Sequence, residues 1–184
     1  MKRLLQWVGA VVLVMLAGPS GTAAQTATFG LGGGLTPLNG YYGSVEKAGW
    51  HILGKLDFAI PILPLAVRVD ALYGQTSHKA PYEGDGNTTL IGGLANLVWK
   101  IPTAAPMMTP YVIAGGGVYH VKITIPSVPV DTSATTFAFD LGAGVNVGAG
   151  PVHLFVEGRY LNIRERGSSV NFIPLTAGVS FGSK

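Results

Sequence analysis

The stretch Trp50-His51-Ile52-Leu53-Gly54-Lys55-Leu56-Asp57-Phe58-Ala59-Ile60 alternates apolar and polar side chains with a period of two. That period is typical of a β-strand, because successive side chains point to opposite faces. The apolar members of one face are Trp50, Ile52, Leu56, Phe58 and Ile60, and the polar members of the other face are His51, Lys55 and Asp57. Segment 65–75 repeats the pattern, with Arg68 and Asp70 opposite an apolar face. Strands of this kind have one apolar face and one polar face.

Eight such segments can be drawn along the chain: 27–35, 49–60, 65–75, 88–101, 108–121, 135–147, 151–162 and 171–181. Each is about as long as a tilted transmembrane strand, which needs about 9 to 11 residues. The connections alternate between short turns rich in Pro and Gly, at 61–64, 102–107 and 148–150, and longer polar loops, at 36–48, 76–87, 122–134 and 163–170. Short turns on one side and long loops on the other are typical of outer-membrane barrels. The sequence therefore predicts an all-β fold, an eight-stranded antiparallel up-and-down transmembrane β-barrel with both termini on the short-turn side.

The charges within these segments lie opposite the apolar face. Four are positive and four are negative: Lys55, Asp57, Arg68, Asp70, Lys100, Asp140, Glu157 and Arg159. The interior of an eight-stranded barrel is just filled by side chains. Charges packed there must pair, since pairing offsets the cost of removing them from water. We therefore expect a lumen plugged by a network of ion pairs among these eight residues.

The aromatic residues of the apolar face gather near the strand ends. We expect them to form an aromatic girdle of two rings at the two bilayer interfaces. Those at the long-loop ends are Trp50, Tyr73, Tyr119, Phe137 and Tyr160, and those at the short-turn ends are Phe58, Trp99, Tyr111 and Phe181.

Composition and the first residues narrow the class of protein further. Of 184 residues, 48% are hydrophobic and only 11% are charged, and the absence of cysteine excludes disulfides, thiolate metal sites and thiol nucleophiles. Residues 1–24 combine a basic start, an apolar run and the small residues Thr22-Ala23-Ala24, which predicts a signal peptide cleaved after Ala24 and a barrel domain over 25–184. Without Lys2 and Arg3 the net charge falls to +1, so nucleic acid is not an expected partner.

The final segment, Phe172 to Phe181, alternates and ends on an aromatic residue, like the C-terminal signal of outer-membrane proteins. Together with the signal peptide, the strand count and the turn asymmetry, it resembles the small eight-stranded outer-membrane proteins of the OmpA/OmpX type. The chain departs from that pattern by continuing with Gly-Ser-Lys. The resemblance implies Sec-type export to a bacterial outer membrane, periplasmic termini, insertion by the barrel-assembly machinery, contact with outer-membrane lipids and a monomeric state.

Catalysis and metal binding have weaker support in the sequence. Some barrels of this size act on lipid A, and Ser77, His78 and Glu83 share one predicted loop, with His120 near another. Neighbours such as Ser77 and His78 point in opposite directions along an extended chain. The other histidines, His51 and His153, are expected to form hydrogen bonds in the lumen, and no metal-ligand spacing is present. We therefore expect no enzyme, no cofactor and no metal.

The expected function is a structural or surface-interaction role. Alternation persists through 122–134, so the fifth and sixth strands are expected to project outward and to offer a sheet edge to a partner. Basic residues expected at headgroup height, where they would contact lipopolysaccharide phosphates, are Lys47, Lys79, Lys122, Arg164 and Arg166. One alternative is a lipid A-modifying barrel enzyme, an acyl hydrolase or acyltransferase. A second alternative is a soluble lipocalin-like ligand-binding barrel.

Overall fold

The computed structural model describes residues 27–37, 48–77, 87–105, 107–124, 132–148, 150–165 and 168–182. Their regular structure is entirely β: β1 (Ala27–Thr36), β2 (Gly49–Ala59), β3 (Leu65–Ser77), β4 (Asn87–Lys100), β5 (Met108–Thr124), β6 (Thr132–Val147), β7 (Val152–Glu165), β8 (Ser168–Phe172) and β9 (Leu175–Phe181). Within these ranges there is no helix of the length and apolarity that a membrane crossing requires.

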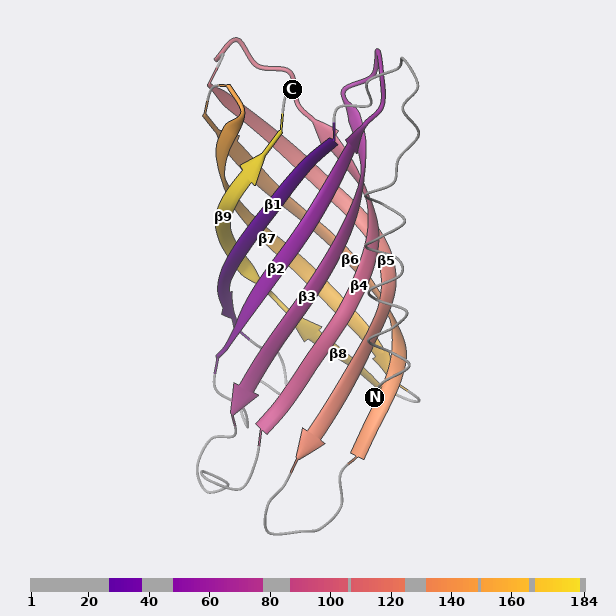
Figure 1. The fold of residues 1–184 in the computed structure, drawn as a ribbon. Coiled ribbons are helices and arrows are strands. Elements are labelled where there is room, and N and C mark those ends of the chain that lie inside the picture. The colour runs from indigo at the N-terminus through magenta and orange to yellow at the C-terminus, as the bar shows by residue number, and fades with distance from the viewer. Residues whose placement is uncertain are drawn as a thin grey trace.

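The strands form one antiparallel sheet that closes on itself (Figure 1). Neighbours in sequence pair from β1 to β7, and closure comes from β9, which pairs with both β7 and β1. Strands β8 and β9 both pair with β7, so they are two parts of one eighth strand. The predicted continuous strand 171–181 is wrong in this respect, because Pro174 has no backbone N–H to donate and the strand is broken at Ile173 and Pro174. The fold is a closed eight-stranded barrel.

The two faces of the wall are sorted as the alternation predicts. Arg68 is 1% exposed and Lys55 is 2% exposed, whereas Ile52 on the outer face is 55% exposed. The outer surface is covered by apolar residues from every part of the ring, among them Leu31, Leu35, Leu97, Val118, Leu141, Leu154 and Leu175. A barrel in water would bury its apolar face and expose its polar face. This barrel does the opposite, so its outer surface is suited to the apolar interior of a membrane.

Inward-facing glycines make room for large side chains of the lumen. A Cβ atom on Gly92 would overlap the Tyr119 ring, and one on Gly144 would overlap the Tyr111 ring. Because glycine has no side chain, two bulky residues fit within a ring of only eight strands.

The β5–β6 hairpin extends beyond the predicted strands, from Met108 to Thr124 and from Thr132 to Val147. The two strands pair as far as Ile123 and Thr132, whereas pairing between β6 and β7 begins only at Ala138 with Ile163. Among the described residues, segment 132–137 therefore has a strand ladder on one side only. This agrees with the expected projection of the fifth and sixth strands.

Candidate functional site

The middle of the lumen is crossed by an ion pair between opposite strands of the ring. Arg68 on β3 donates from Nη1 to Glu157 Oε2 on β7 at 2.6 Å and from Nε to Asp57 Oδ1 on β2 at 2.5 Å. All three side chains are buried. A guanidinium has a fixed planar set of donors, so it can hold two carboxylates at once.

A second guanidinium, that of Arg159 on β7, contacts three carboxylates. Its Nη1 donates to Asp70 Oδ2 at 2.8 Å and to Asp140 Oδ2 at 3.0 Å, and its Nε donates to Glu157 Oε1 at 2.6 Å. Asn96 adds a bond from Nδ2 to Asp70 Oδ2 at 2.7 Å. Glu157 therefore joins the two arginines into one network.

Lys55 completes the network through an ion pair and two aromatic rings. Its Nζ lies 3.9 Å from Asp57 Oδ2 and 3.7 Å from the centroid of the Phe155 ring. The Tyr111 hydroxyl donates to Glu157 Oε2 at 2.8 Å, and its ring centroid lies 5.1 Å from the Arg68 guanidinium carbon. We call the ionised members of this network the charged layer: Lys55, Asp57, Arg68, Asp70, Asp140, Glu157 and Arg159.

One predicted member is not part of the charged layer. Lys100 is the last residue of β4, at the short-turn end, and is only half-buried. It forms no ion pair with another residue of the described ranges. At a strand end a lysine keeps its ammonium near water, so it needs no buried counter-charge. The charged layer consequently holds three cations and four carboxylates.

The half of the lumen nearer the long-loop ends contains an apolar core. Its core consists of buried residues from β4 to β8: Leu90, Leu94, Tyr119, Ala138, Leu161, Ile163 and Phe172. Leu72 on β3 and Val121 on β5 pack against this core. The lumen that the sequence predicts to be polar is thus mixed in this half, where buried polar residues such as His51 and Thr76 accompany the apolar core.

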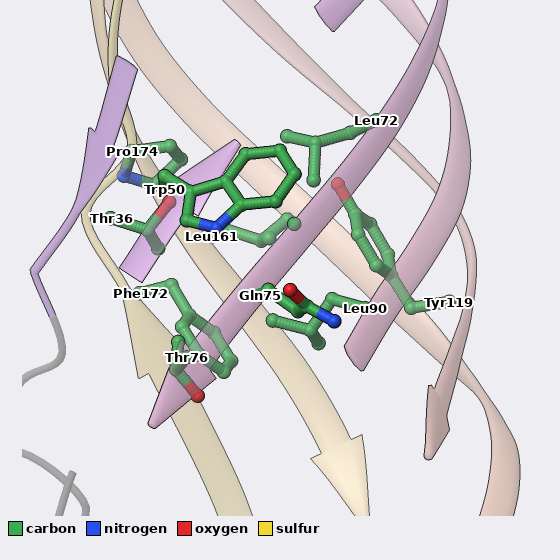
Figure 2. Close-up of a pocket in the computed structure, with 11 residues that line it drawn as sticks. Thr36, Trp50, Leu72, Gln75, Thr76, Leu90, Tyr119, Leu161, Phe172 and Pro174 are labelled. Carbon is green, nitrogen blue, oxygen red and sulfur yellow. The ribbon is translucent and has the colours of Figure 1, made fainter. Parts of the chain in front are cut away.

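Two small spaces lie in this half of the lumen. One is nearer the long-loop ends, and Figure 2 shows it with Leu72, Leu90, Leu161 and Phe172 drawn around it. The other, nearer the charged layer, is lined by Leu72 and Leu161 again, and also by Leu94 and Arg159. We call the two spaces together the apolar chamber, which adjoins the charged layer.

Two buried polar atoms belong to residues that line the chamber. Tyr119 lines both spaces, and Arg159 lines the one nearer the charged layer. Tyr119 Oη and Arg159 Nη2 have no hydrogen-bond partner among the described protein residues. Both side chains are more than nine-tenths buried.

Seven predicted girdle residues lie on the outer surface. Trp50 and Tyr73 pack together there, with ring centroids 5.8 Å apart. Their companions on the outer face are Phe58, Trp99, Phe137, Tyr160 and Phe181.

The prediction that Tyr111 and Tyr119 belong to the girdle is wrong. Both point into the lumen and are 1% exposed. β5 carries apolar residues on both faces, so a period of two does not identify its outer face. The inward-facing glycines Gly92 and Gly144 leave room in the lumen for the rings of Tyr119 and Tyr111.

The histidines and the catalytic candidates are only partly within the described residues. His51 is buried in the lumen, and its ring nitrogens lie 2.8 Å from the hydroxyls of Thr36 and Thr176. His153 is buried too. His120 lies on the outer surface, with Nδ1 3.0 Å from the Thr135 hydroxyl. His78 and Glu83 lie outside the described residues, and no group of metal-ligand type is found in the part that is described.

Only two of the five residues expected to contact lipopolysaccharide lie within the described part of the chain. Lys122 at the end of β5 and Arg164 at the end of β7 are exposed. The Arg164 guanidinium carbon lies 5.4 Å from the centroid of the Phe139 ring on the outer face. The others, Lys47, Lys79 and Arg166, lie outside the described residues.

Comparison with known proteins places the fold. Residues 8–181 match the family model described as outer membrane protein beta-barrel domain. Among solved structures, the chain is similar to Neisserial surface protein A, with a TM-score of 0.66 and 18% identity over 84% of this chain and 96% of that one. It is also similar to the attachment invasion locus protein Ail of Yersinia pestis, with a TM-score of 0.50 and 16% identity over 85% of this chain and 97% of that one. The similarity to a major outer membrane protein of Thermus thermophilus has a TM-score of 0.51 and 13% identity over 85% of this chain and 99% of that one. No curated protein matches.

Proposed function

Because the chain belongs to the outer membrane protein beta-barrel domain family, we propose that it is a non-conducting barrel that acts at the bacterial cell surface. Its role is structural or interactive, and the lumen does not serve as a pore. Residues 1–24 are the export signal in this proposal, and both termini face the periplasm.

The observation that carries the closed lumen is the charged layer. The Arg68–Glu157 and Arg159–Asp70 pairs each join β3 to β7, which are opposite strands of the eight-stranded ring. An ion entering from water would have to separate these pairs inside a space already filled by side chains. This arrangement favours a plug over a conduit.

Purified protein reconstituted in planar lipid bilayers tests the plug. We expect no discrete conductance steps, while a sixteen-stranded porin in the same bilayers conducts, since wider barrels leave an aqueous channel. Stable unitary conductance of the refolded protein would overturn the proposal. Heat-modified migration on a detergent gel, from an outer-membrane fraction, verifies that the tested material is the folded barrel.

Surface interaction is supported by the projecting β5–β6 hairpin. Ser133, Ala134 and Thr135 are exposed, on a segment whose ladder is one-sided among the described residues. A one-sided strand is a template for strand addition by another chain. The Thr136 hydroxyl donates to the Arg164 carbonyl oxygen, which ties the base of this segment to β7.

Contact with lipopolysaccharide phosphates is the second part of the surface role. The exposed Arg164 holds its guanidinium over the Phe139 ring on the outer face, which places a cation at the end of β7. Replacing Lys47, Lys79, Lys122, Arg164 and Arg166 by glutamine should weaken binding to bilayers that contain lipopolysaccharide. Lys100→Gln, at the opposite end of the barrel, is the control. Unchanged binding by the fivefold variant contradicts this contact.

The enzyme alternative has its own readout. A lipid A acyl hydrolase or acyltransferase changes the acyl chains of lipid A, so mass spectrometry of lipid A with and without the protein separates the two functions. We expect identical spectra. The apolar outer surface supports the membrane barrel over the soluble lipocalin-like alternative.

A further inference from the structure

Two of the short turns carry large, exposed apolar side chains. The first turn joins β2 to β3 and the second joins β4 to β5, and both lie at the upper end of the barrel in Figure 1. The backbone N–H of Lys100 donates to the Pro64 carbonyl oxygen at 2.7 Å, so the first turn lies against the start of the second. We call the exposed apolar residues of the two turns and their flanks the apolar rim: Ile62, Leu63, Ile101, Met107 and Met108.

The first of these turns is suited to apolar surroundings in its backbone as well as its side chains. Residues 58–65 read Phe-Ala-Ile-Pro-Ile-Leu-Pro-Leu and contain no charged or polar side chain. The two prolines have no backbone N–H to donate. The N–H groups of Ile60 and Leu63 donate within the turn, to the carbonyl oxygens of Leu65 at 2.9 Å and of Ile60 at 3.3 Å. Most backbone donors of the turn are thus absent or satisfied internally, as contact with lipid requires.

The tip of this turn holds a fully exposed isoleucine in a strained conformation. Among the described residues other than glycine, only Ile62 has a positive φ, of 74°. This conformation is costly for a β-branched residue, whereas asparagine or glycine adopts it readily. In water the residue would combine a strained backbone with a hydrated apolar side chain. Contact with hydrocarbon removes the second of these costs, because an aliphatic side chain is more stable out of water.

The apolar rim continues the outer wall of the barrel. Leu97 and Trp99 are exposed on the outer face of β4, and Ile101 follows them just past the end of that strand. Leu65 pairs with Trp99, and Ile62 at the tip of the turn is three residues beyond Leu65. Three residues of a tilted strand rise about 7 Å, and the interfacial region on each side of the hydrocarbon core is about 5–7 Å thick. The rim therefore adjoins the wall that faces acyl chains and stays close to the membrane boundary.

From these observations we propose that the apolar rim inserts into the inner leaflet of the outer membrane, with Ile62 and Leu63 against phospholipid acyl chains. This inference rests on the proposed orientation, in which the short turns face the periplasm. The third short turn differs, because its sequence Gly148-Ala149-Gly150-Pro151 has no large apolar side chain. The membrane contact of the barrel is therefore deeper on the side of β2 to β5 than at the turn between β6 and β7.

The experiment uses nitroxide labels on the full barrel in phospholipid bilayers. The chain has no cysteine, so each single-cysteine variant carries its label at one chosen site. Labels at Ile62→Cys and Leu63→Cys should collide more often with oxygen, which concentrates in lipid, than with a water-soluble nickel chelate. Leu97→Cys on the outer wall is the lipid reference, and the exposed Ser133→Cys is the water reference. Pro151→Cys, at the third short turn, should resemble the water reference.

The labels distinguish failure of this proposal from failure of the membrane barrel. If the Ile62 and Leu63 labels match the Ser133 label while the Leu97 label reports lipid, the barrel is inserted but the turn lies in water, and the proposal is overturned. A Pro151 label in lipid overturns the difference between the two sides of the barrel. Bilayers with the same lipids in both leaflets make the result independent of orientation, and the conductance measurement tests the closed lumen separately.

Ile62→Asn tests the insertion by the sign of its effect. Asparagine tolerates a positive φ, so in an aqueous turn the change relieves strain and should raise the urea midpoint of unfolding. If the side chain is inserted, the change places an amide among acyl chains and should lower the midpoint in phospholipid vesicles. Ile62→Leu, which keeps an aliphatic side chain, should remain close to wild type, and heat-modified migration verifies folding. An unchanged or raised midpoint for Ile62→Asn overturns the proposal.

Discussion

The charged layer and the apolar chamber fill the same narrow cylinder by different means. In the charged layer, hydrogen-bonded ion pairs link side chains of different strands, as with Arg159 and its three carboxylates. In the chamber, side chains such as Leu94 and Leu161 are held by packing alone. Removing one member of the first leaves a charge unpaired, whereas removing one member of the second leaves a void. The two regions should therefore differ in how strongly they respond to truncation.

The largest effect is expected for Glu157→Ala. This change removes the carboxylate that both arginines contact and leaves each of them short of a buried partner. We expect the free energy of unfolding in detergent to fall by about 3–5 kcal/mol, measured by urea titration with heat-modified migration. Arg68→Ala should act in the same direction. The neighbouring outward residue gives the control, Val156→Ala, which should cost at most about 1–2 kcal/mol. Equal losses for Glu157→Ala and Val156→Ala would refute the network.

A smaller loss is expected in the chamber. Leu161→Ala removes a buried side chain next to the existing spaces, and we expect a cost of about 2–4 kcal/mol in the same assay. Because no charge is stranded, the loss should add to that of the more distant Arg68→Ala within about 0.5 kcal/mol. Strong coupling between Leu161→Ala and Arg68→Ala would show that the two regions are one unit.

Tyr111→Phe sharpens the boundary of the charged layer. It deletes a hydroxyl that donates to the buried Glu157 carboxylate at 2.8 Å and preserves the ring. We expect a loss of about 1.5–3 kcal/mol, the range for a hydrogen bond to a charged group. Tyr160→Phe on the outer face should stay within about 0.5 kcal/mol. A Tyr111→Phe barrel as stable as wild type would mean that the hydroxyl does not support the network.

The smallest effect compares two adjacent glycines of β4. A Cβ on inward Gly92 meets the Tyr119 ring, while one on outward Gly93 lies 3.7 Å from the Asp70 carbonyl oxygen, an ordinary contact. Gly92→Ala should cost about 1–2 kcal/mol through forced movement of the ring, and Gly93→Ala should be neutral. Both are measured by the same unfolding assay. The opposite order would reverse the assigned faces of β4.

Alternation and charge predicted most of the fold and the charged layer. Seven of the predicted segments correspond to β1 to β7 within a few residues, and Lys55, Arg68 and Glu157 lie where a lumen network requires them. The central parts of β2, β3 and β7 have charges on one face only, so the inner face of these strands is unambiguous. The break in the eighth strand had a signal in Pro174, which cannot donate to a ladder.

The apolar chamber was not predicted, because alternation assigns one polarity to each face along its whole length. Leu72 follows Asp70 on the inward face of β3, and Leu161 follows Arg159 on that of β7. The inward face changes from polar to apolar along the barrel axis. This change can be recognised only when the register shows which residues of different strands lie at the same height. Tyr111 and Tyr119 were misassigned for a related reason: β5 has no charge in its central part to mark the lumen side.

The separation of the network partners along the chain has a consequence for biogenesis. Arg68 and Glu157, like Asp70 and Arg159, are 89 residues apart in sequence. The β2–β3 hairpin contains the Arg68–Asp57 pair, but no early hairpin can contain either of the pairs to β7. Arg68 and Asp70 therefore gain their partners on β7 only when the later part of the chain has joined the sheet, so a chain truncated before β7 retains just the local share of the network.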